Sequence, residues 1–101
     1  VVLAYLQLPT TARLTVLSHV ESWLKPGGTV FIIAHDESNV ADGHGGPSDP
    51  DVCYTPGETA EALARLDVTT AEVVERYVDT DDGTATALDT LVIATKPTSV
   101  N

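Results

Sequence analysis

With 101 residues, 43% of them apolar, the chain has the length and composition of one small globular domain with a thin core. Fifteen acidic residues against 5 basic ones give a formal net charge of -10, which disfavours binding to nucleic acids and anionic membranes. A lone cysteine, Cys53, permits no internal disulfide, and neither a signal peptide nor a membrane-spanning run is visible. We therefore expect a cytoplasmic protein.

The first residues, Val1–Leu6, form an apolar, β-prone segment that is typical of the middle of a buried strand, whereas natural termini are usually polar and frayed. The sequence also contains no methionine. We expect residues 1–101 to form a single partial domain from the C-terminal part of a longer protein.

A helix is predicted over Ala12–Lys25, with Thr10 or Thr11 as its N-cap and Lys25 at its positively charged C-terminus. Its apolar residues recur at helical spacing, which predicts one face packed on a sheet. The residues predicted to form this face are Val16, Leu17, Val20, Trp23 and Leu24.

The segment Pro26-Gly27-Gly28 cannot continue the helix, so the chain must turn there. Thr29–Ala34 is an unbroken β-prone run, the pattern of a strand buried on both faces within a parallel sheet between helices. Strand, helix and strand form a βαβ unit, so we expect Val1–Leu6 to lie parallel to Thr29–Ala34. Ligands of such sheets bind beyond the carboxyl ends of the strands, which is where His35 and Asp36 fall.

Residues 36–54 are rich in glycine and proline and show no periodicity, which predicts a long loop that is either functional or disordered. A capping box, Thr55-Pro56-Gly57-Glu58, predicts a helix from about Pro56 to Leu66 with Ala60, Leu63 and Ala64 on its apolar side.

Two β-rich segments, Thr70–Asp79 and Ala85–Thr95, surround the turn Asp81-Asp82-Gly83 and predict an antiparallel hairpin with Arg76 opposite Asp89. Residues 97–101 form a polar tail. The expected spatial order of the four strands is first, second, fourth, third, in an α/β fold.

The motif L-K-P-G-G-T-V-F-I-I-A-H (24–35) and the later Y-T-P-G-E, L-D-V, A-E-V-V-E-R and D-T-L-V-I-A-T-K-P resemble the C-terminal half of a class I S-adenosylmethionine-dependent methyltransferase. The variant they resemble is the small, single-domain bacterial type grouped with tellurite-resistance and thiopurine methyltransferases. The resemblance covers nearly the whole chain. It implies a partial Rossmann-like sheet, β-α-β-loop-α-β-β, ending in an antiparallel hairpin. The family's acidic, glycine-rich loop after its first strand and its acidic residue after the second strand are both absent here.

The resemblance further implies that Tyr5, Leu6 and Gln7 border the methionine end of S-adenosylmethionine. It assigns the shaping of the pocket for a small-molecule acceptor to residues 36–54, with Asp36, Asn39, Gly45, Gly46 and Tyr54 as candidate substrate-binding residues. In that setting His35 is the candidate catalytic residue, because a neutral imidazole takes a proton from the acceptor as methyl transfer proceeds.

Structural roles stand beside each of these assignments. His35 is also readable as a strand cap that hydrogen-bonds the loop. Asp36 and Asn39 are equally readable as turn formers, and Gly43–Pro50 as plain flexible loop rather than a lid. The spacing of His35, Asp36, His44 and Cys53 matches no zinc-ligand pattern, so we expect no metal site. We expect Cys53 to be a buried structural thiol and Trp23 a core residue.

Two functions follow from the sequence. The first is methyl transfer to a small-molecule acceptor, as part of a longer chain. The second is a non-catalytic dimerisation or binding module that retains half of the fold and pairs through the unprotected Val1–Leu6 edge.

Overall fold

The computed structural model describes residues 1–98, so residues 99–101 of the predicted tail lie outside the described residues. One sheet holds four strands in the order β1 (Val2–Ala4), β2 (Thr29–His35), β4 (Gly83–Thr95), β3 (Asp67–Thr80). The strands β1 and β2 are parallel, and β4 is antiparallel to both β2 and β3. This confirms the predicted strand order and the C-terminal hairpin.

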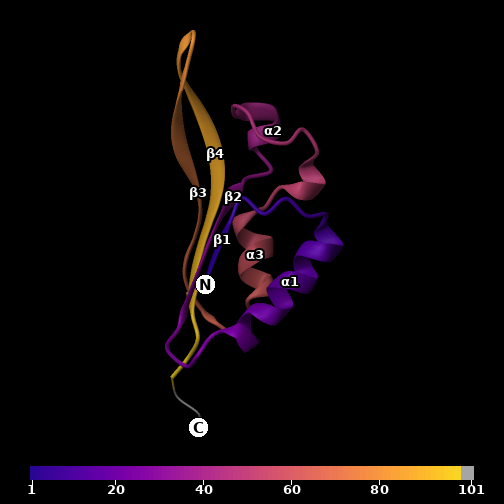
Figure 1. The fold of residues 1–101 in the computed structure, drawn as a ribbon, viewed down its shortest axis with the longest axis vertical. Coiled ribbons are helices and arrows are strands. Elements are labelled where there is room, and N and C mark those ends of the chain that lie inside the picture. Colours follow the sequence, from indigo (N-terminus) through magenta and orange to yellow (C-terminus); the bar gives the residue numbers. More distant parts are fainter. Residues whose placement is uncertain (99–101) are drawn as a thin grey trace.

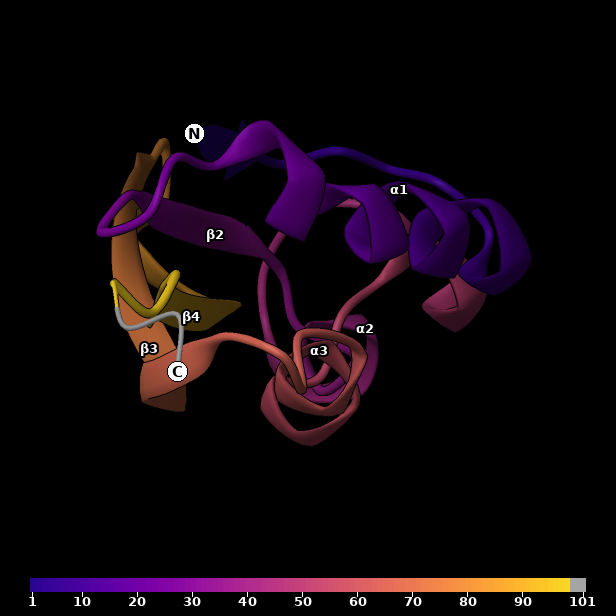
Figure 2. The ribbon, with the colours of Figure 1, turned by 90° about the horizontal axis from the view of Figure 1, so that it is seen from below.

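The helices gather on one face of this sheet (Figures 1 and 2). They are α1 (Thr10–Trp23), α2 (Asn39–Asp42) and α3 (Pro56–Ala62), with a 3-10 turn, η1, at Pro50–Val52. Along β2, Val30, Ile32 and Ala34 are buried on the helical face, whereas Phe31 and Ile33 on the opposite face are half-buried. The expectation of a strand buried on both faces was therefore wrong for residues 1–98, because no helix of this part of the chain covers the second face.

The face of α1 that meets the sheet is shifted from the predicted one. Leu17, Val20 and Leu24 join the core, and so does the side chain of Arg13, which is 3% exposed. Trp23 is 52% exposed and stacks on His19 at the surface, so its prediction as a core residue was wrong.

Both ends of α1 depart from the expected caps. The N-cap residue is Pro9, without a side-chain cap, because the hydroxyl of Thr10 donates to Asp51 instead. At the other end Lys96, rather than Lys25, donates from Nζ to the carbonyls of Glu21 and Leu24, both at 3.0 Å. A lysine from the end of β4 thus satisfies the C-terminal carbonyls of the helix.

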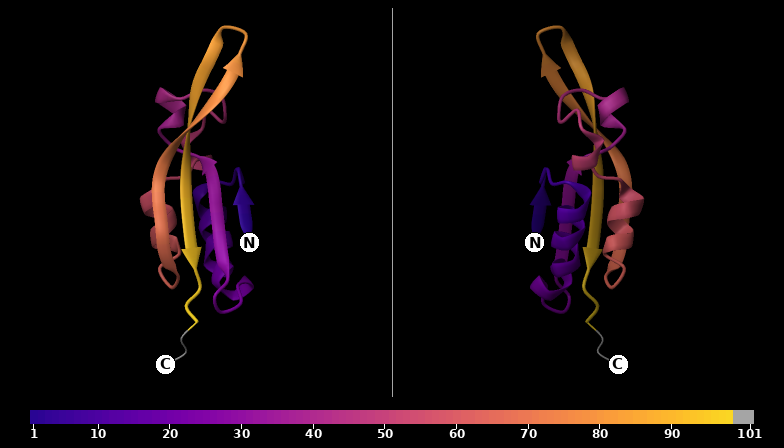
Figure 3. Two further views of the ribbon diagram at one scale, coloured as in Figure 1. Left: turned by 90° about the vertical axis from the view of Figure 1, so that its left-hand side faces the viewer. Right: turned by 90° about the vertical axis from the view of Figure 1, so that its right-hand side faces the viewer.

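The β3–β4 hairpin is the longest feature and extends past the rest of the sheet (Figure 3), giving overall dimensions of 55 × 24 × 18 Å. The strands pair up to Thr80 and Gly83, around a turn of two residues. Asp89 pairs with Val74 and Arg76 with Ala87, so the expected register was off by two residues. The expected ion pair nevertheless forms on the diagonal, with Arg76 Nε 2.9 Å from Asp89 Oδ2.

Helix α3 begins at Pro56 as predicted and ends earlier, at Ala62, with Ala64 exposed beyond it. Half of the expected capping box forms: the Glu58 amide donates to the Thr55 hydroxyl, while the Glu58 carboxylate pairs with Arg13. Within residues 1–98, no helix combines the length and the apolar character needed to cross a membrane.

Candidate functional site

The carboxyl ends of β1 and β2 bring Tyr5 and His35 together, as expected for adjacent parallel strands. Their ring centroids lie 5.0 Å apart. The backbone of Tyr5 has a φ of 55°, a conformation that non-glycine residues rarely adopt, while its amide still donates to the Ile33 carbonyl at 2.7 Å. Strained residues of this kind gather at functional sites.

A buried carboxylate lies next to these two rings. Asp89 of β4 pairs with His35 of β2 in the sheet register and is 0% exposed. Its Oδ2 accepts hydrogen bonds from the Tyr5 hydroxyl at 2.8 Å and from Arg76 Nε at 2.9 Å. We call Tyr5, His35, Asp89 and Arg76 the strand-end cluster, to which each of the four strands or its end contributes one residue.

The pKa values of both Tyr5 and Arg76 are raised in the strand-end cluster, and Asp89 contributes to each shift. Burial, followed by the hydrogen bond to Asp89 and its negative charge, raises the pKa of the Tyr5 phenol, so this hydroxyl stays a neutral donor. The hydrogen bond to Asp89 raises the pKa of Arg76. The guanidinium carbon of Arg76 also lies 5.4 Å from the Tyr5 ring centroid, within cation–π distance.

Two polar atoms of the cluster lack partners. His35 Nδ1 and Asp89 Oδ1 are buried and make no hydrogen bond within residues 1–98, and they lie 3.9 Å from one another. Buried polar groups are nearly always paired, so two unpaired buried atoms side by side single out this cluster as the candidate site.

The loop over residues 36–54 passes against His35. Gly46 has a φ of +71°, and a Cβ at this position would lie 2.9 Å from His35 Nδ1. Gly45 has a similar φ of +70° and faces open space. Of the other two residues expected to border the cofactor, Leu6 is half-buried and Gln7 is exposed.

Asp36 and Asn39 hold this loop in place through hydrogen bonds. Asp36 is 4% exposed and accepts hydrogen bonds from the Thr90 hydroxyl and from the Ser38 amide and hydroxyl. Asn39 is 2% exposed, accepts from the Leu88 amide at 2.8 Å and donates to the Gly45 carbonyl at 2.9 Å. These contacts match the turn-forming alternative for both residues.

Tyr54 is also internal to the fold, at 1% exposure. Its hydroxyl donates to the Leu6 carbonyl at 2.9 Å, which ties the end of the loop to the segment after β1. Its contribution is therefore to hold the chain beside the strand-end cluster.

Cys53 is buried, as expected, and does not belong to the strand-end cluster. Burial, and then the negative charges of Asp36, Glu37 and Asp49, raise the pKa of its thiol, so it is a poor nucleophile. His44 is exposed. Among residues 1–98, no group of three or more histidine, cysteine or acidic side chains is arranged to hold a metal ion.

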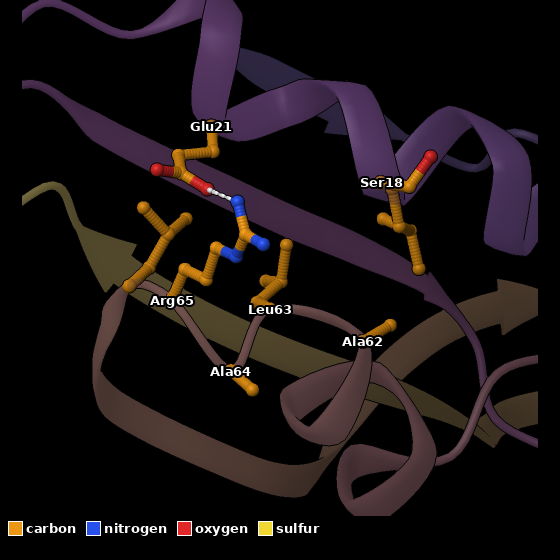
Figure 4. Close-up of a pocket in the computed structure, with 8 residues that line it drawn as sticks. Ser18, Glu21, Ala62, Leu63, Ala64 and Arg65 are labelled. Carbon is orange, nitrogen blue, oxygen red and sulfur yellow. Dashed lines mark ion pairs between the residues drawn. The ribbon is translucent and has the colours of Figure 1, made fainter.

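A cavity of about 370 Å³ lies away from the strand-end cluster, between α1 and the segment that follows α3 (Figure 4). Leu17, Leu63 and Leu66 line it, and Glu21 and Arg65 form an ion pair of 3.8 Å across it. A second hollow of about 310 Å³ borders Cys53 and Arg13. Neither is lined by a histidine, so the strand-end cluster remains the candidate site.

Sequence reasoning assigned Tyr5 and His35 to the candidate site but did not assign Asp89 or Arg76 to it. A signal was present, because the expected hairpin pairing already joined an arginine to an aspartate on neighbouring strands. The sequence did not show how far this pair lies from the end of the first strand. That distance depends on the register between β2 and β4.

Comparison with known proteins supports the fold. The structure of a SAM-dependent methyltransferase from Methanosarcina mazei matches 97% of this chain with a TM-score of 0.63 and 15% sequence identity. The chain spans 58% of the length of that protein. No protein-family profile and no curated protein sequence matches. The chain thus shares the fold of part of that protein.

Proposed function

We propose that this chain is the C-terminal half of an S-adenosylmethionine-dependent methyltransferase of the small, single-domain bacterial type that includes tellurite-resistance and thiopurine methyltransferases. Its proposed activity is methyl transfer to a small-molecule acceptor. The observation that carries the proposal is the strand-end cluster, where Tyr5 and His35 meet at the carboxyl ends of parallel strands within a methyltransferase fold.

The residues of the cluster fit one end of the cofactor. The Tyr5 ring and the nearby Asp89 carboxylate offer the electron-rich surface that a sulfonium cation favours. We assign Tyr5, Leu6 and Gln7 to the methionine end. The glycine-rich loop and the acidic residue that hold the rest of the cofactor in this family are absent from the sequence, so tight binding requires a preceding segment.

Bound S-adenosylmethionine supplies an electrophilic methyl group. In the proposed reaction, His35 accepts the proton that the acceptor loses. Gly45 and Gly46 bring the loop backbone close to the acceptor, while Asp36, Asn39 and Tyr54 fix the loop through their internal hydrogen bonds. Alignment of the acceptor and exclusion of water provide most of the rate enhancement in such a displacement.

Calorimetric titration of S-adenosylhomocysteine into this chain and into a longer parent chain tests the proposal. We expect binding by the parent and weak or no binding by residues 1–101. In the parent, Tyr5→Ala should weaken binding, whereas Tyr77→Ala, at a hairpin position that is 69% exposed, should not. No binding by either chain would overturn the proposal.

The alternative function, a dimerisation or binding module, is supported by the exposed edge of β1. Within residues 1–98 this strand pairs with β2 alone, and Val1 and Val2 are 46% and 67% exposed. Unprotected apolar edges pair with other chains. Gel filtration tests this alternative: a dimer that Val2→Lys converts to a monomer would support it, and a monomeric wild-type chain would exclude edge-driven dimerisation.

A further inference from the structure

The two unpaired buried atoms of the strand-end cluster have complementary chemistry. Asp89 Oδ1 is an acceptor without a donor, and His35 Nδ1 carries either a proton or a lone pair depending on the tautomer of the imidazole. We propose that Asp89 is a positioning residue for His35: its Oδ1 selects the tautomer with the proton on Nδ1 and leaves Nε2 as the base.

The hydrogen bonds of Asp89 explain why it acts in this way. Its Oδ2 already accepts hydrogen bonds from the Tyr5 hydroxyl and from Arg76 Nε. Only Oδ1 remains free, and it points toward His35 at 3.9 Å. A lone pair on Nδ1 facing this carboxylate is repelled, whereas an N–H at the same place is attracted.

The loop favours the same arrangement. Gly46 lies against Nδ1 so closely that a Cβ would clash with it, and Nδ1 is consequently shielded from water. Nε2 is not among the buried unpaired atoms, and 13% of the His35 side chain remains exposed. A shift of about 1 Å between Nδ1 and Oδ1 would complete a direct hydrogen bond.

The role of this pair in catalysis rests on the proposed function. An acceptor with an O–H, N–H or S–H group forms a bond from that atom to the methyl carbon and passes its proton to Nε2. The electron pair of the broken sulfur–carbon bond stays on the departing sulfur. The resulting imidazolium donates from Nδ1 to Asp89, which offsets the new positive charge. The site therefore suits protic acceptors.

Side-chain ¹⁵N NMR of the labelled chain at neutral pH tests the tautomer without requiring methyl transfer. We expect His35 to be predominantly protonated on Nδ1, with the exposed His19 and His44 as internal comparisons. Asp89→Asn should remove this preference of His35. Tyr5→Phe, which keeps the carboxylate, should leave the Nδ1–H tautomer in the majority.

A wild-type His35 protonated mainly on Nε2, or an unchanged spectrum in folded Asp89→Asn, would overturn the proposal. If Asp89→Asn does not fold, the wild-type and Tyr5→Phe spectra still decide the tautomer. Absence of S-adenosylhomocysteine binding by the parent would remove the catalytic role and leave the tautomer result standing, so the two failures are distinguishable.

Discussion

The guanidinium carbon of Arg13 lies 4.8 Å from the centroid of the Tyr54 ring, which places a charged side chain of α1 against the aromatic ring that ends the long loop. Arg13 also donates to the Leu8 and Asp51 carbonyls and pairs with Glu58 of α3. One buried side chain therefore joins the segment after β1, the loop and α3. The Tyr54 hydroxyl continues this junction to the Leu6 carbonyl, next in sequence to Tyr5 of the strand-end cluster.

Replacing Arg13 by methionine should lower the free energy of unfolding by about 2 kcal/mol, because the Leu8 and Asp51 carbonyls lose their donor while the apolar volume is largely kept. Glu58 is 46% exposed on its side chain, so water can solvate the carboxylate that is left. Urea unfolding provides the measurement. Arg65→Met is the matched control: Arg65 is 86% exposed and makes a 3.8 Å ion pair, so it should change stability by less than about 0.5 kcal/mol.

The buried hydrogen bond from Thr90 to Asp36 should fix the start of the loop. Thr90→Val keeps the shape of the side chain and removes the hydroxyl, so one carboxylate oxygen in a buried site loses its donor. We expect a loss of about 1–2 kcal/mol in urea unfolding. Thr84→Val, at an exposed position of the same strand, is the control. Equal stability of the two variants would mean that the loop is held by other contacts.

Stability should decrease at alkaline pH. Burial raises the pKa values of Tyr54 and Tyr5 above the ordinary tyrosine value of 10.0. It also raises the pKa of Cys53 above the ordinary cysteine value of 9.0. These groups favour the folded chain while protonated, so their contribution is complete below the unfolded values and is lost as pH rises through the folded ones. Thermal melts from about pH 8 to about pH 11 should show a plateau followed by a decline.

The Tyr54→Phe variant tests whether the Tyr54 phenol causes this loss of stability at alkaline pH. The variant should be less stable at neutral pH, because it loses the hydrogen bond to the Leu6 carbonyl, but its decline should be shallower. Tyr77→Phe removes an exposed phenol, whose pKa is raised mainly by its hydrogen bond to Glu75, and should change the slope less. A slope in Tyr54→Phe as steep as in the wild type would assign the decline to other groups.

The local patterns of the sequence were sufficient to predict the βαβ unit and the hairpin. Residues such as Ile32 and Val92 lie in unbroken β-prone runs, and Pro26-Gly27-Gly28 ends the helix whatever surrounds it. The parallel pairing of β1 with β2 follows from these elements and from the crossover between them. The proximity of Tyr5 to His35 was predictable for the same reason, since each lies at the carboxyl end of a parallel strand.

Charge pairs between distant parts of the chain could not be predicted from local sequence patterns. Arg13 falls on the buried face of α1 because Glu58, the Asp51 carbonyl and the Tyr54 ring surround it, and these groups lie 38 or more positions along the chain. Trp23 was assigned to the core from its apolar character and spacing, whereas the turn into β2 leaves it at the surface. Asp89 required the register of three strands, which no local pattern specifies.

The contact between Gly46 and His35 yields a prediction with a close internal control. Gly46→Ala and Gly45→Ala impose the same backbone strain, because both glycines have a φ near +70°, but only the alanine at 46 would collide with the imidazole. Each should therefore lose about 1 kcal/mol of stability from strain alone. Gly46→Ala should in addition move His35, which is measured as a change in the ¹⁵N shifts of its side chain. An equal response of the His35 spectrum to both substitutions would mean that the loop acts on His35 through its overall conformation and not through the contact at Gly46.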